Sequence, residues 1–136
     1  AQAKGYMVVA SSAFRSSKTQ EYILEARLAA IGEEAYSHVA LPGHSEHQLG
    51  VAADLTSLAV DYDSAAHRFG DSLDGQWIAK HAHEYGFVQS YPYGKEYVTG
   101  YIYEPWHYRY VGVELAQKLY EAKMTLTEYL QNKASE

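Results

Sequence analysis

Cysteine is absent from the 136-residue sequence, which excludes disulfide bonds and thiolate metal sites. No apolar run is long enough to span a bilayer. Acidic residues outnumber Lys and Arg by 17 to 11, for a formal net charge of −6, and the basic residues do not cluster. Binding to nucleic acid would require a basic stripe, and attraction to an anionic membrane would require basic residues near its surface. We therefore expect a domain that contacts neither nucleic acid nor membrane.

Repeats, linkers and low-complexity blocks are also absent, so residues 1–136 are expected to form a single domain. A chain of this length can bury a core without covalent cross-links. Tyrosine is the unusual component, with 14 residues, and fits either a half-solvated groove or a tyrosine-rich sheet. The chain starts at Ala1 without a signal-peptide pattern. We expect it to be part of a longer protein whose N-terminal part is missing here.

Apolar periodicity and turn residues predict both strands and helices. Strands are expected over residues 5–12, 51–55, 87–91, 97–103 and 106–111. Helices are expected from a capping box at 17–20 to Gly32, from Trp77 to Gly86, over 113–122, and after a second capping box at 125–128. Residues 57–75 are polar and are expected to form a surface loop. The predicted fold class is α+β, with a mostly antiparallel sheet flanked by helices.

Side chains able to bind a metal are concentrated in two segments, Ser45–Asp54 and Glu104–His107. Without cysteine, a catalytic zinc site must use histidine and carboxylate, commonly three protein ligands and a water. In the first segment, a turn at Gly50 leading into a strand would let His47 and Asp54 reach one metal ion.

In the second segment, Pro105 favours an extended backbone at Glu104, so Glu104 and His107 need not follow strict strand alternation. Both can then face one cavity, one as ligand and the other as base. A carboxylate outside the metal's ligands can take the proton of an attacking water and pass it to the leaving amine. We assign His47, Asp54 and His107 to the metal and Glu104 to the base.

Three motifs carry a family resemblance. Residues 45–54 resemble the S-x-H-x-x-G-x-A-x-D pattern of VanY-type D-alanyl-D-alanine carboxypeptidases, zinc peptidases grouped with the lysostaphin-like peptidases and the Hedgehog domain. Phe14-Arg15-Ser16 with Gln20 is similar to the family's upstream Y-R-S-x-x-x-Q signature. Gly94-Lys95-Glu96, Thr99-Gly100-Tyr101 and residues 103–112 resemble its second motif. The motifs follow the family's order and cover roughly residues 8–112.

The resemblance implies a Hedgehog/D-Ala-D-Ala-peptidase-like fold and a single zinc carboxypeptidase domain. It places His47, Asp54 and His107 on the family's zinc ligands and Glu104 on its catalytic base. The cofactor it implies is Zn²⁺.

Three further positions are implied to meet the substrate. Arg15 falls on an arginine that binds the substrate's carboxylate or stabilises the oxyanion, Ser45 on a serine that contacts the substrate, and Gln20 on the glutamine of the signature. The guanidinium fork of Arg15 suits a terminal carboxylate on chemical grounds alone. Ser45 would fit a turn or a helix cap equally well.

The sequence also departs from the family pattern. Phe14 replaces the usual tyrosine, and Ser90 stands where an arginine usually precedes the tyrosine, so one supporting ion pair is expected to be missing. The helix that normally precedes the first strand is absent from this chain. These differences bear on substrate preference and leave the ligands and the base intact.

We therefore expect a monomeric zinc carboxypeptidase that removes a C-terminal D-alanine from peptidoglycan stem peptides or muropeptides, by D,D- or L,D-cleavage. Its expected location is the bacterial cell envelope, outside the cytoplasm. Two alternatives stay open: an endopeptidase that cleaves between L-Ala and D-Glu, and a catalytically silent zinc-containing binding module. A silent module could dispense with the base, whereas this sequence retains Glu104.

Overall fold

A four-stranded sheet forms the centre of the molecule in the computed structural model, which describes residues 1–135. The strands are β1 (Val8–Ser12), β2 (Ala52–Ser57), β3 (Phe87–Gln89) and β4 (His107–Tyr110). They are ordered β1-β2-β4-β3, and every neighbouring pair is antiparallel. The prediction of an α+β fold with an antiparallel sheet flanked by helices is confirmed.

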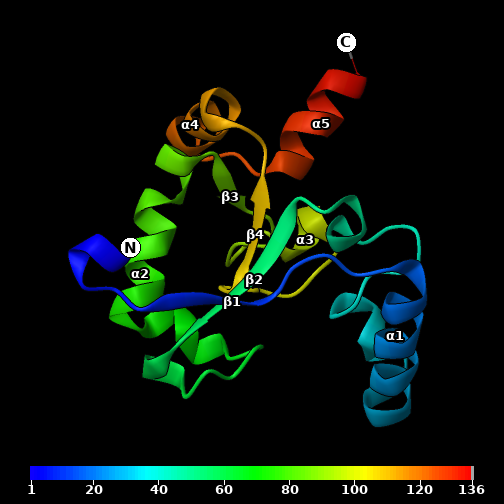
Figure 1. Cartoon of the computed structure of the whole chain (residues 1–136). Coiled ribbons are helices and arrows are strands. Elements are labelled where there is room, and N and C mark those ends of the chain that lie inside the picture. Colours follow the sequence, from blue (N-terminus) through cyan, green and yellow to red (C-terminus); the bar gives the residue numbers. More distant parts are fainter. Residues whose placement is uncertain (136) are drawn as a thin grey trace.

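Five α-helices surround the sheet: α1 (Ser17–Ile31), α2 (Leu73–His81), α3 (Glu96–Thr99), α4 (Val113–Ala122) and α5 (Leu126–Ala134). Figure 1 shows α1 and α2 on opposite sides of the molecule with the strands between them, and α4 and α5 together at one end. Short 3₁₀ helices fill the connections: η1 (Gln2–Lys4), η2 (Gly32–Ser37), η3 (Glu46–Leu49), η4 (Leu58–Val60), η5 (His67–Asp71) and η6 (Ala82–Tyr85). Among the helices within residues 1–135, none combines the length and apolar character needed to cross a membrane.

Helix boundaries follow the local sequence with two shifts. The helix predicted from Trp77 to Gly86 begins earlier, at Leu73, and its α-helical part ends at His81, after which η6 continues to Tyr85. The predicted helix over 113–122 and the capping box at Thr125 and Glu128 are both present. The first long helix is capped by Ser16, whose hydroxyl accepts from the amide of Thr19, so the predicted box beginning at Ser17 is wrong by one residue. Ser16 has the extended backbone of a cap, whereas Ser17 is already helical.

The predicted surface loop over 57–75 is wrong, because it supplies much of the core. Val60, Ala66 and Phe69 are buried against Trp106, and Phe69 is 0% exposed. The turns η4 and η5 bring these apolar side chains inward, and such short turns leave no periodic pattern in a polar sequence. Leu55 of β2 packs on the same cluster.

The predicted strand over 97–103 is also wrong. Glu96–Thr99 forms the short helix α3, which ends at Gly100 with a φ of 76°. The alternation of tyrosine and β-branched residues in 97–103 indicated a strand. In the structure these residues belong to an irregular segment, in which the Ile102 amide donates to the Ser37 carbonyl. Strand propensity was overridden by tertiary contacts.

Candidate active site

The two central strands place an acid and a base directly opposite each other. In the pairing of β2 with β4, Asp54 is the partner of His107. Residues paired across an antiparallel ladder project from the same face, with their side chains about 4.5–5.5 Å apart at Cβ. Both residues are buried, with 5% and 4% of their surface exposed. Backbone pairing therefore fixes this half of the site.

His47 reaches the same point from η3, the turn that precedes β2. Its Nδ1 lies 2.6 Å from the Ala13 carbonyl oxygen, and its own carbonyl accepts from the amide of Arg15 at 3.2 Å. Gly50 ends the turn with a φ of 70°, a conformation that glycine adopts without steric cost, and so leads the chain into β2. The segment after β1 and the turn before β2 thus hold the imidazole from two sides.

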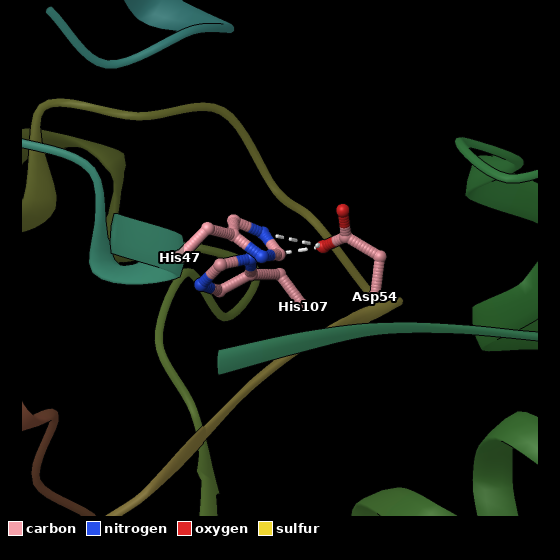
Figure 2. A group of neighbouring side chains, drawn as sticks. All are labelled: His47, Asp54 and His107. Atoms are coloured by element: carbon pink, nitrogen blue, oxygen red, sulfur yellow. Dashed lines mark hydrogen bonds and ion pairs between the residues drawn. The ribbon is translucent and has the colours of Figure 1, made fainter. Parts of the chain in front are cut away.

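The three side chains converge on one carboxylate oxygen, as Figure 2 shows. Asp54 Oδ1 lies 3.2 Å from His47 Nε2 and 3.0 Å from His107 Nδ1. Their ligand atoms all lie within 4.8 Å of one another. The structure therefore brings together the residues that the sequence assigned to the metal.

The donor set fits a divalent cation such as zinc. A carbonyl oxygen only accepts, so His47 Nδ1 must carry a proton, and a neutral His47 then points an unprotonated Nε2 at the Asp54 carboxylate. Two lone pairs facing each other repel, and only a proton or a metal cation between them makes this contact favourable. Two imidazoles and a carboxylate, buried, are also the ligand types that zinc prefers.

The electrostatics of the site favour positive charge in the same place. Burial alone would lower the pKa of His107, but hydrogen bonds to Asp54 and Glu46 raise it to about 9. Burial likewise opposes ionisation of Asp54, yet hydrogen bonds from His107 and His47 hold its pKa well below the ordinary value. In the metal-free chain an imidazolium thus supplies the positive charge that the surrounding carboxylates require.

Glu104 lies beside this cluster, at the turn that leads into β4. Its amide donates to the Tyr91 carbonyl, and its carboxylate Oε2 is 4.0 Å from His107 Nδ1. Within residues 1–135 the Glu104 carboxylate accepts no hydrogen bond, although the side chain is only 10% exposed. Burial raises its pKa to about 7. Glu104 is therefore a buried carboxylate with a pKa near neutral pH, and it lies beside the three side chains that could hold a metal ion.

Arg15, Ser45 and Gln20 line the same cavity. The Arg15 guanidinium contacts Asp54 Oδ2 through Nη2 and donates to Ser12 Oγ through Nε. Gln20 is 1% exposed; its amide nitrogen donates to the Ala40 carbonyl, and its Oε1 has no hydrogen-bond partner among the described residues. Ser45 precedes η3 but makes no side-chain cap.

The cavity around these groups has a volume of about 520 Å³. That volume suits the end of a peptide and falls within the usual range of ligand sites. Its lining includes side chains of α1 and of the chain after η2, together with Ser64, Ala65, His67 and Trp106. Of the tyrosines between 97 and 110, Tyr101 lines the cavity, and its ring centroid lies 4.7 Å from that of Tyr91 with the two rings tilted by 39°.

Two neighbours of His107 were missed by the sequence reasoning. Tyr91 stacks on the His107 ring at 4.9 Å, and Glu46 contacts His107 Nε2 at 2.8 Å. Glu46 lies directly before His47, and its position inside the first motif was the only signal in the sequence. Phe14, where the family pattern has tyrosine, is 67% exposed.

Comparison with known proteins agrees with this geometry. The family model described as VanY, D-alanyl-D-alanine carboxypeptidase, matches residues 1–113. The protein YodJ of Bacillus subtilis (strain 168) is 40% identical over 132 residues, which cover 96% of this chain and 48% of YodJ.

Solved structures share the fold. The LD-carboxypeptidase LdcB superposes with a TM-score of 0.88 at 40% identity, over 96% of this chain and 61% of the LdcB chain. The D,D-pentapeptidase VanY of a VanB-type resistance cassette, solved with Zn(II), gives a TM-score of 0.82 at 33% identity, over 95% of this chain and 74% of that chain. The chain spans about half the length of the curated relative and less than two thirds of LdcB. With its fold, its site and these matches in agreement, the chain belongs to the VanY family of D-alanyl-D-alanine carboxypeptidases.

Proposed function

We propose that this chain is a zinc-dependent carboxypeptidase that removes the C-terminal D-alanine from peptidoglycan stem peptides. One observation carries the proposal: a buried carboxylate with no hydrogen-bond partner in the described chain, Glu104, faces the His47–Asp54–His107 cluster inside a cavity of about 520 Å³. A silent zinc-binding module would have no need to keep, beside the cluster, a buried carboxylate that accepts no hydrogen bond in the described chain.

Zinc would be held by His47 Nε2, Asp54 Oδ1 and His107 Nδ1, the three atoms that converge. When bound, the ion polarises the scissile carbonyl and lowers the pKa of a bound water to about 7. His47 Nδ1–H donates to the Ala13 carbonyl, and His107 Nε2–H donates to the Glu46 carboxylate. The converging nitrogens, His47 Nε2 and His107 Nδ1, are thereby left free for the metal.

Glu104 acts as the general base and then as the acid. Its carboxylate takes a proton from the attacking water and delivers it to the amine of the leaving D-alanine. A pKa of about 7 in the metal-free chain suits both transfers, and a nearby cation favours the ionised form that starts the cycle. The absence of any hydrogen bond to this carboxylate in the described chain leaves it free to face the water.

Arg15 supplies the anchor for the terminal carboxylate. Its guanidinium has five N–H donors, of which the contacts with Asp54 and Ser12 occupy two. Gln20 lines the cavity, and its Oε1, which has no hydrogen-bond partner among the described residues, is the proposed acceptor for a backbone N–H of the substrate. Ser45, with its hydroxyl uncommitted to a cap, is the third substrate contact.

The substrate class follows from the relatives. VanY is a D,D-pentapeptidase and LdcB an LD-carboxypeptidase, and this chain is similar to both. We infer that residues 1–136 form one catalytic domain that acts as a monomer on stem peptides or muropeptides. Its place of action is the bacterial cell envelope outside the cytoplasm, because that is where this substrate lies.

Defined tetra- and pentapeptide muropeptides provide the test. The protein is incubated with each in the presence of zinc, and products are read by mass spectrometry, with the Glu104→Gln variant and a chelator-treated sample as controls. Release of free D-alanine from one or both substrates, abolished in both controls, is the expected result. Cleavage between L-Ala and D-Glu would replace the proposal with an endopeptidase, and no cleavage of any stem peptide would refute it.

A further inference from the structure

A third acidic residue, beside Asp54 and Glu104, completes the surroundings of His107. Glu46 belongs to η3, and its neighbour His47 is one of the three converging side chains. The Glu46 side chain is 19% exposed, and its carboxylate lies behind His107, on the ring edge opposite Asp54. It does not belong to the cluster that could hold the metal itself.

The contacts of Glu46 are specific to each oxygen. Oε2 lies 2.8 Å from His107 Nε2 and also accepts from the Ser90 hydroxyl at 2.6 Å. Oε1 faces Arg109 Nη1 at 3.5 Å. The carboxylate is therefore held by a hydroxyl from the residue that follows β3 and by a guanidinium from β4.

Strand geometry explains why Arg109 can reach it. Arg109 follows His107 by two residues in β4, so both side chains project from the same face. The residue paired with Arg109 across the ladder is Ala52, whose small side chain leaves room above the sheet. Ser90, at the departure from the family pattern noted in the sequence, contributes a hydroxyl to the same carboxylate.

A carboxylate accepts and does not donate, so the contact with Glu46 requires a proton on His107 Nε2. In a neutral imidazole that proton leaves Nδ1 as the unprotonated nitrogen, and Nδ1 is the atom that faces Asp54. We propose that Glu46 is a positioning residue that holds His107 in the tautomer and orientation required for Nδ1 to bind zinc. This inference rests on the proposed zinc site. In it, Ser90 and Arg109 hold the Glu46 carboxylate in place through their separate contacts with it.

Zinc affinity is the first measurement. Dissociation constants are determined by competition with a chromophoric chelator for the wild type, Glu46→Leu, Glu46→Gln and the control Glu25→Gln, which changes an exposed residue of α1. Glu46→Leu should weaken zinc binding about 10- to 100-fold, the usual scale for losing such a partner of a ligand. Glu46→Gln keeps a neutral acceptor and should lose less, about 3- to 10-fold. Glu25→Gln should bind as the wild type does.

The His107 ring supplies a readout that general destabilisation would not move. In ¹⁵N-labelled, zinc-loaded wild type, Nε2 should carry a proton with a strongly downfield resonance, because a carboxylate holds it. Glu46→Gln should shift this resonance upfield while the protein stays folded, and Glu25→Gln should leave it in place. This measurement decides the question even if Glu46→Leu does not fold.

The outcomes separate the two proposals. Wild-type affinity in folded Glu46→Leu, or an unchanged Nε2 proton in Glu46→Gln, would overturn the role of Glu46 and leave the zinc site standing. A wild-type protein that binds no zinc would overturn both. A graded loss of affinity together with the shifted resonance would establish Glu46 as the residue that positions His107.

Discussion

Arg15 offers the sharpest test of the proposed chemistry, because a carboxypeptidase must recognise a free C-terminus. The two perturbations are the Arg15→Ala substitution and amidation of the substrate's terminal carboxylate. If the guanidinium binds that carboxylate, each change removes the same interaction. Arg15→Ala should then be slow on the free acid and nearly indifferent to amidation.

The magnitude follows from the contact. A hydrogen bond to a charged group contributes about 1.5–3 kcal/mol, which corresponds to about 10- to 100-fold in kcat/KM. The Arg15 side chain is 19% exposed and also contacts Asp54, so its loss is expected to weaken zinc binding as well. Arg15→Lys keeps the charge but loses the planar fork, so its kcat/KM on the free acid should lie between those of the wild type and Arg15→Ala.

The assay measures kcat/KM for wild type and variants on acid and amide forms of one stem peptide, at zinc concentrations that saturate every variant. Zinc content is determined in parallel, which separates loss of metal from loss of substrate binding. If the substitution and the amidation multiply, Arg15 serves only the oxyanion. Equal cleavage of amidated or extended stems by the wild type would refute the carboxypeptidase proposal and favour the endopeptidase.

Four further predictions concern the site and the core. Glu104→Gln should keep its zinc and lower kcat by about 10² or more; zinc content falling in step with activity would make Glu104 a ligand instead. His47→Ala and His107→Ala should each lose most of about one zinc per chain by metal analysis, and full retention would remove that residue from the site. In the metal-free protein the pKa of His107 is raised from 6.5 to about 9, so the stability it contributes is complete below 6.5 and is lost as the pH rises through 9. The melting temperature of chelator-treated protein should therefore fall over this interval, and a rising one would contradict the assignment. Phe69→Ala, at a fully buried position, should lower the free energy of unfolding by about 3–5 kcal/mol in denaturant titrations. A decrease of less than about 1 kcal/mol would mean that residues 57–75 do not contribute to the core.

Elements with a repeating apolar pattern could be predicted from the sequence. The helix over 113–122 has the same bounds in the structure, because its apolar stripe buries Ala116 and Leu119. The strand that becomes β1 and the turn at Gly50 were likewise visible locally. The family membership, resting on motifs with fixed spacing, is confirmed by the comparisons.

Features that depend on distant partners could not be predicted. The contact between Glu46 and His107 joins residues 61 positions apart, and nothing near Glu46 announces it. Residues 96–99 have the composition of a strand but lack a neighbouring strand to pair with, and so form a helical turn. The individual roles of His47, Asp54, His107 and Glu104 remain proposals, although the structure brings all four together.

The pairing of Asp54 with His107 across β2 and β4 has a consequence for how this enzyme family could diversify. Two converging side chains are placed by backbone hydrogen bonding between the central strands. This pairing tolerates little change, because a one-residue slip of either strand would turn its side chain to the opposite face and separate the two. Parts of the cavity lining come from α1, from Ser64, Ala65 and His67, and from the segment containing Tyr101, none of which takes part in that pairing. These segments can therefore vary, and change the shape of the cavity, without disturbing the strand pairing that brings Asp54 and His107 together.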